Sequence, residues 1–204
     1  MKRQVEIYNV PDPVIVIRSW FTSEELSKIW EEIDTLSKPY SMQTSDKVGG
    51  AVEENSRLKT GYGLFLDQHY FNRRDSSFIL SMREKFFNEN FYKLLLSVDK
   101  SFNHFINSTS DTTLLNYYEE NHSYKKHFDR SIFTCVVPLW QEPKKFDGGD
   151  FLIADKNFNL KSNDLIIFPG YVLHEVKPIT VHNDFEKWKS GRFSLTTFIN
   201  YRSY

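Results

Sequence analysis

The chain has 204 residues, with 26 Lys and Arg against 27 Asp and Glu, so its formal net charge is −1. This balance gives no general reason to expect a nucleic-acid or membrane partner, and the 40% hydrophobic share is typical of a globular domain. The single cysteine, Cys135, excludes an intramolecular disulfide and favours a reducing compartment, so we expect a cytoplasmic protein. We expect neither a signal peptide nor a transmembrane helix, because no long apolar run is present.

The front of the chain predicts one strand, one helix and a loop. Val14–Ile17 is a β-branched run that indicates a strand. Thr22 and Glu25 form a capping-box pattern, and apolar residues then recur at helical spacing, which predicts a helix over about 22–36. Residues 40–57 are polar and predict a loop. Gly49-Gly50 would let this loop close as a lid, and an ordinary surface loop is the alternative.

The rest of the chain changes from helical to β-rich. A strand is expected over 59–66, and a helical region over 76–106 with a break near Asn88 or Val98. Short β-rich runs then follow, separated by turn residues: Leu114–Tyr118, Ser131–Leu139, Gly149–Ile153, Asp164–Phe168, Val172–Val176 and Arg192–Asn200. This order predicts a mainly β fold with flanking helices (α+β), in which the helices pack outside a sandwich or barrel.

A His-x-Asp triplet at residues 127–129 places two metal-ligand side chains close together. On an extended segment, residues i and i+2 point to the same side, so His127 and Asp129 can share a metal. The pattern alone is weak, because the chain has a second copy at residues 182–184 and a surface histidine is the ordinary explanation. Only the first copy has a histidine downstream in a β-rich run, His174. Two histidines and one carboxylate form the facial triad of non-haem iron(II) sites.

His174 and Arg192 are both ambiguous when each is taken alone. His174 follows a Pro-Gly turn, where a core histidine bonded to a backbone carbonyl is the more ordinary explanation. Arg192, Ser194 and Thr196 alternate along one strand and therefore share a face. A guanidinium on an inward face needs an anion and can bind a carboxylate through two hydrogen bonds, whereas a surface arginine at a strand end is the alternative.

Taken in order, these residues resemble the iron(II)- and 2-oxoglutarate-dependent dioxygenases, and most of all their prolyl 4-hydroxylase-like branch. Each motif is common, but their order and joint spacing are specific. The matching runs are Leu114–Tyr118, Tyr124–Asp129, Gly148–Leu152, Phe168–Gly170, His174–Pro178 and Gly191–Leu195. The strong part covers about residues 112–200, and a weaker likeness covers the opening strand, the helix and the run Leu58–Leu64.

The resemblance implies a double-stranded β-helix, or jelly roll, in a single domain of residues 1–204. Helical support is expected over about 18–110 and the catalytic core over about 112–200. The implied Fe(II) ligands are His127, Asp129 and His174. The implied 2-oxoglutarate contacts are Arg192 with Ser194, and a tyrosine for which Tyr118 has the better spacing and Tyr117 is the rival. Ascorbate is the accessory reductant expected of this branch.

The chain departs from the family pattern before its last strand. Between His174 and Arg192 lie 17 residues, several more than is usual, so residues 180–190 are expected to form an inserted loop. Arg202 is the fallback if Arg192 does not face the site.

The resemblance implies hydroxylation of a C–H bond, with a prolyl residue in a peptide or protein as the expected substrate. A free amino acid or another small metabolite is the alternative, and nucleic acid is not expected as a partner. From a different class, a non-catalytic jelly roll that keeps its metal pocket would bind metal without turnover. A zinc hydrolase is a further alternative, but Glu175 is expected to point away from the face of His174.

Overall fold

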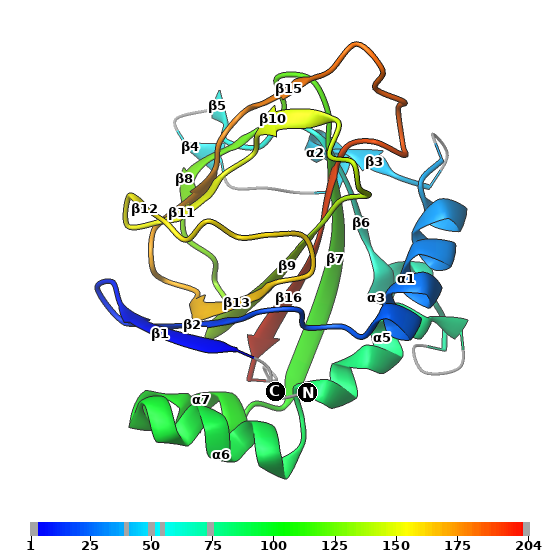
Figure 1. Ribbon diagram of the computed structural model, residues 1–204. Coiled ribbons are helices and arrows are strands. Elements are labelled where there is room, and N and C mark those ends of the chain that lie inside the picture. Colours follow the sequence, from blue (N-terminus) through cyan, green and yellow to red (C-terminus); the bar gives the residue numbers. More distant parts are fainter. Residues whose placement is uncertain (1–3, 39–40, 49–51, 54–55, 73–75, 202–204) are drawn as a thin grey trace.

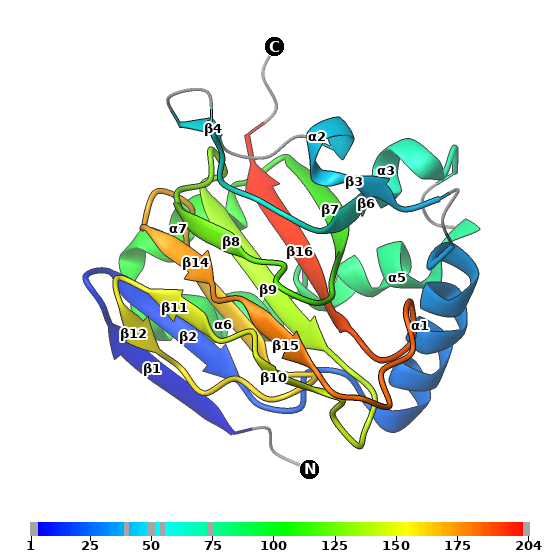
Figure 2. The same ribbon diagram turned by 90° about the horizontal axis from the view of Figure 1, so that it is seen from above.

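The computed structural model describes residues 4–38, 41–48, 52–53, 56–72 and 76–201. Within them, antiparallel sheets form a jelly roll with helices outside the larger sheet (Figure 1, Figure 2). The larger sheet has the order β1 (Val5–Asn9), β2 (Pro13–Ile17), β13 (Leu165–Pro169), β9 (Phe133–Leu139), β16 (Arg192–Asn200), β7 (Ser110–Tyr118), β6 (Tyr62–Phe65) and β3 (Gln43–Thr44). The predicted fold class is therefore confirmed.

The smaller sheet lies opposite the middle of the larger one (Figure 2). Its order is β12 (Lys156–Asn157), β11 (Phe151–Ile153), β14 (His174–Val176) and β8 (Tyr124–His127). Two further pairs stand apart from these sheets, β10 (Phe146–Gly148) with β15 (Ile179–Val181) and β4 (Val52–Glu53) with β5 (Ser56–Arg57). Of these, β8, β10 and β12 were not predicted, because each is short and lacks a β-branched run. Strand β15 was not predicted either, because its Ile-Thr-Val run overlaps the expected loop at 180–190.

Helix α1 (Ser23–Leu36) confirms the helix that the capping pattern predicts. The Thr22 hydroxyl accepts from the backbone N–H of Glu25 at 3.2 Å, and the Glu25 carboxylate accepts from that of Thr22 at 2.8 Å. These two bonds satisfy N–H groups that the first turn leaves free. The apolar side chains of Ile29, Ile33 and Leu36 are buried, so this helix covers the core with one face.

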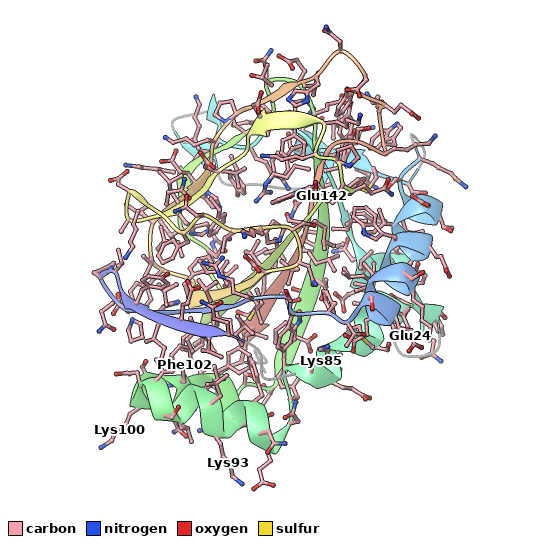
Figure 3. The ribbon with its side chains drawn as sticks, viewed as in Figure 1. Glu24, Lys85, Lys93, Lys100, Phe102 and Glu142 are labelled. Atoms are coloured by element: carbon pink, nitrogen blue, oxygen red, sulfur yellow. The ribbon has the colours of Figure 1, made fainter. Side chains whose placement is uncertain are left out.

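The second helical region is broken in two places rather than one. It contains α5 (Phe78–Ser81), η1 (Met82–Lys85), α6 (Glu89–Val98), η2 (Lys100–Phe102) and α7 (Asn103–Ile106). Asn88 caps the start of α6 and Asp99 ends it, so both predicted break points are real. Figure 3 shows Phe102 on the sheet side of these helices, while Lys93 and Lys100 extend away from the molecule.

Two hydrophobic clusters lie on the two faces of the larger sheet. The outer cluster joins the helices to strand residues such as Ile15, Leu115 and Phe133. The inner cluster lies between the sheets and includes Val136 and Phe168. Strand alternation sends successive side chains to opposite clusters, which is why these strands are buried on both faces.

The predicted loop at 40–57 is wrong for its described part, which holds β3, α2 (Ser45–Val48), β4 and β5. Gly49-Gly50, the expected hinge of a lid, lies outside the described residues. The strand expected over 59–66 is shorter, because β6 covers Tyr62–Phe65 and a short helix, α3 (Leu66–His69), follows. Lys59 makes a bridge with Tyr124 before β6 pairs with β7, so this segment crosses from the smaller sheet to the larger.

None of the helices in the described residues is long and apolar enough to cross a membrane.

Candidate metal and co-substrate site

His127, Asp129 and His174 meet between the two sheets. Their candidate ligand atoms all lie within 4.8 Å of one another, and no other such cluster occurs among the described residues. Nε2 of His174 is 3.4 Å from Oδ2 of Asp129, and Nε2 of His127 is 3.8 Å from Oδ1. The two histidines are direct partners in the β8–β14 pairing, so neighbouring strands hold the two imidazoles side by side.

The other ring nitrogen of each histidine is held by the backbone. Nδ1 of His127 lies 2.8 Å from the carbonyl of Lys125, and Nδ1 of His174 lies 2.9 Å from that of Val172. Carbonyls only accept, so each neutral ring keeps its proton on Nδ1 and a lone pair on Nε2. Burial, followed by the charge of His174, lowers the pKa of His127 to about 4, so this ring is neutral near pH 7.

The third ligand candidate, Asp129, is fixed by its surroundings rather than by a strand. Strand β8 ends at His127, so the expected alternation does not place Asp129. Its backbone N–H donates to the carbonyl of Gly170 at 2.7 Å, and its carboxylate accepts from the Thr134 hydroxyl at 2.6 Å. A Cβ at Gly170 would lie 2.2 Å from the carbonyl oxygen of Ser131, so only glycine permits this close approach.

The donor set suits a divalent cation. Burial alone would raise the pKa of Asp129, but hydrogen bonds and charges from His174, Thr134 and His127 lower it below its usual range. When both rings are neutral and carry their proton on Nδ1, two nitrogen lone pairs and a carboxylate face one another. A bound metal relieves this repulsion, and two histidines with one carboxylate are the donors preferred by non-haem iron(II).

Arg192 supplies a buried cation to the same cavity. Only 2% of the residue is exposed, and its Nη1 has no hydrogen-bond partner among the described residues. The guanidinium lies 5.6 Å from the centre of the Tyr118 ring. A Cβ at Gly149, where φ is +71°, would lie 2.9 Å from Cδ of Arg192, so this glycine leaves room for the side chain. A buried guanidinium with an unpaired Nη1 is suited to bind a carboxylate.

The structure separates the two candidate tyrosines. Tyr118 lines the cavity and is 2% exposed, directly opposite Arg192 in the β7–β16 pairing. Tyr117 points to the other face, where its hydroxyl accepts from the backbone N–H of Trp188 at 2.7 Å and its ring stacks on that indole. Tyr118 is therefore the tyrosine that a ligand in the cavity can reach.

Ser194 and Thr196 line the cavity beside Arg192, as the strand alternation predicts. Their hydroxyls accept from the side-chain amide of Asn116 at 3.3 and 3.2 Å. The carbonyl oxygen of that amide accepts from Nζ of Lys59 at 2.5 Å. The sequence alone indicates no role for Asn116, Lys59 or Thr134, because each acts through a partner that is distant in sequence or across a turn.

The second His-x-Asp triplet has no part in this site. His182 bonds to Asp147 at 3.1 Å on the surface, and Asp184 pairs with Lys145. The segment expected to be an inserted loop, residues 180–190, begins within β15. Near its end, the Trp188 ring stacks on the ring of Tyr117. Arg202, the fallback cation, lies outside the described residues.

Residues 112–200 match the sequence pattern of the 2OG-Fe(II) oxygenase superfamily. This part of the chain is similar to 2OG-Fe(II) oxygenase domains. It is 34% identical to a PKHD-type hydroxylase of Xylella fastidiosa, in an alignment covering 32% of this chain and 37% of that protein. A PKHD-type hydroxylase of Acinetobacter baylyi is also 34% identical, over 33% and 37% of the two chains. The alignments thus span little more than a third of these relatives.

The fold of the chain extends the likeness beyond the matched residues. A prolyl-4-hydroxylase of Pseudomonas putida has a TM-score of 0.62 at 14% identity, covering 93% of each chain. A viral collagen prolyl hydroxylase of Paramecium bursaria Chlorella virus-1 has a TM-score of 0.54 at 12% identity, covering 91% of this chain and 94% of the other. At these identities the likeness shows the shared jelly-roll fold, including the strands and helices before residue 112.

Proposed function

We propose that the chain is an iron(II)- and 2-oxoglutarate-dependent dioxygenase that hydroxylates a C–H bond of a prolyl residue in a peptide or protein. The observation that carries this proposal is the pairing, in one cavity, of a His-Asp-His cluster with a buried guanidinium whose Nη1 has no partner among the described residues. A metal suits the first and a dicarboxylate co-substrate suits the second. A bound metal and a bound dicarboxylate together account for both features of the cavity.

Each residue has a defined part in this proposal. His127, Asp129 and His174 hold the metal on one side, which leaves open positions for other ligands. Arg192 pairs with the far carboxylate of 2-oxoglutarate, with Tyr118 and Ser194 beside it. When bound, the iron and its co-substrate supply the oxidising chemistry, and succinate and CO2 are released. The protein's part is to position the groups and to keep the cavity dry.

The prolyl substrate is supported by the names of the relatives and by the shared fold. Ascorbate as a reductant, a cytoplasmic location and the absence of a nucleic-acid partner stay predictions. So does the organisation of residues 1–204 as one domain. The buried free thiol of Cys135 is compatible with a reducing compartment.

The test is conversion of 2-oxoglutarate to succinate by purified protein with Fe(II), measured with and without candidate substrates. Slow conversion is expected alone, with stimulation by proline-containing peptides. Stimulation by free amino acids in place of peptides would move the substrate to the small-metabolite class. Metal binding without succinate production would overturn the proposed enzyme activity and favour a non-catalytic jelly roll that binds metal. Zinc-dependent hydrolysis would instead favour a zinc hydrolase.

A further inference from the structure

Lys59 is a buried amine in the roll that the proposed function does not use. Only 2% of the residue is exposed. Its backbone bridges to Tyr124 where the chain crosses between the sheets, and its Nζ lies 5.7 Å from the centre of the Tyr124 ring. Nζ also donates to Oδ1 of Asn116, which lines the cavity. The side chain is therefore directed inward, toward the space between the sheets.

The surroundings hold this amine in one position. The Asn116 amide nitrogen donates to both Ser194 and Thr196, so its oxygen must face Lys59. That oxygen is the one hydrogen-bond acceptor that the described residues offer to Nζ, which carries three N–H bonds when protonated. Lys59 is thus a preorganised donor with capacity left for a ligand.

The charge of Lys59 acts at the metal end of the cavity. The Tyr124 ring next to it stacks on His127, with ring centres 3.4 Å apart. Burial lowers the pKa of Lys59 to about 8, and the charge of Asp129 opposes this shift, so the amine is largely protonated near pH 7. The charges that act on Arg192 are instead those of Tyr118 and Asp150. Lys59 thus lies beside the ring that stacks on His127, whereas Arg192 lies beside Tyr118.

We propose that Lys59 binds the metal-proximal carboxylate of the 2-oxo acid, so that the cavity holds the co-substrate by one cation at each end. This inference rests on the proposed function. A 2-oxo acid that binds the metal brings a second carboxylate close to Asp129, and the two anions repel each other. A positive charge on that side of the cavity offsets the repulsion, which is strong in a medium of low dielectric constant.

The test measures ligand binding by anaerobic calorimetry of the Fe(II)-loaded protein. Two ligands form a matched pair: 2-oxoglutarate, and 2-oxovalerate, which keeps the 2-oxo acid end but lacks the far carboxylate. Lys59→Met and Lys59→Gln both remove the charge, and Lys59→Gln keeps a donor for Asn116. Arg192→Met is the matched control at the other end. Thermal unfolding and Fe(II) affinity report whether each variant is folded and loaded.

Each variant is expected to weaken the contacts of one end of the ligand and not those of the other. Both Lys59 variants should lower the affinity for both ligands by the same factor, roughly 10- to 100-fold, because each ligand loses one charged hydrogen bond. Arg192→Met should weaken 2-oxoglutarate and leave 2-oxovalerate unchanged. Wild-type affinity in the Lys59 variants would overturn the inference and assign the amine to the substrate or to the fold. Weakening of 2-oxoglutarate alone would also overturn it. A wild-type protein that binds neither ligand would instead refute the proposed function.

Discussion

The Thr134 hydroxyl donates a 2.6 Å hydrogen bond to Oδ2 of Asp129. Because its proton is used in this bond, Thr134 accepts from the Ser131 hydroxyl, 2.8 Å away. Thr134 is fully buried, so water does not compete for either bond. The carboxylate that is proposed to bind iron is thus oriented by a chain of two hydroxyls that starts in the turn before β9.

Replacing Thr134 by valine should weaken Fe(II) binding without changing the fold. Valine keeps the shape but removes the donor, and loss of a partner behind a metal ligand costs roughly 10- to 100-fold in metal affinity. Thr134→Ser keeps the hydroxyl and should bind Fe(II) nearly as wild type does. Competition with a metal chelator measures both constants. Equal affinity in Thr134→Val would mean that the backbone bond to Gly170 alone positions the carboxylate.

The two neighbouring tyrosines should give opposite results. Tyr118→Phe removes a hydroxyl from the cavity and should weaken 2-oxoglutarate binding by roughly tenfold, with little effect on stability. Tyr117→Phe leaves the partly buried backbone N–H of Trp188 without its acceptor and should cost about 1 kcal/mol of unfolding free energy. Binding calorimetry and urea unfolding of both variants check this. A loss of co-substrate affinity in Tyr117→Phe alone would reverse the assignment.

Strand alternation explains how much of the site the sequence could predict. Arg192, Ser194 and Thr196 lie on β16, so their common face follows from spacing alone. The same rule could not choose between Tyr117 and Tyr118. It shows only that they face opposite ways, and the inward face is decided by pairing with β16, 74 or more residues downstream.

Other parts of the site depend on contacts that no local pattern carries. Asp129 was expected on an extended segment with His127, but it lies past the strand end and is held by Gly170 and Thr134. Lys59 was expected on a strand. Its hydrogen-bond partner Asn116 lies 57 residues further along the chain, so local spacing could not predict this contact. Short strands such as β12 form because a neighbour is already in place, which composition does not reveal.

The free energy of unfolding should fall in acid, because protonation of Glu6 weakens its hydrogen bonds at the edge of the larger sheet. Arg18 donates to both carboxylate oxygens, at 2.9 and 2.7 Å, and Tyr8 adds a third bond at 2.6 Å. The Arg18 bond, then the Tyr8 bond, lowers the pKa of Glu6. A carboxyl whose pKa is lower in the folded state stabilises above its unfolded pKa, and this stabilisation is lost as the pH falls through the folded value.

Glu6→Gln should therefore be less stable than wild type at pH 7 by about 1 kcal/mol, because the pair is only partly buried. The difference should shrink toward pH 3, because protons then bind this carboxyl in the unfolded chain and favour unfolding of the wild type. Glu24→Gln is the matched control, since Glu24 is exposed and, in the part of the chain that the structure describes, its ion pair is with Lys28. Urea unfolding at both pH values measures the differences. A gap of the same size at pH 3 would show that charge is not the cause.

His127, Asp129 and His174 are proposed to form an iron site, and the second His-x-Asp triplet of the chain provides a control. Asp129 and Asp184 each end a His-x-Asp triplet, but among the residues with a described position only Asp129 has a third candidate ligand beside it. The most direct measurement is anaerobic Fe(II) binding by wild type, Asp129→Ala and Asp184→Ala. The site described here predicts one Fe(II) per chain in wild type and Asp184→Ala, and loss of that Fe(II) in Asp129→Ala. Full Fe(II) binding by Asp129→Ala would contradict it.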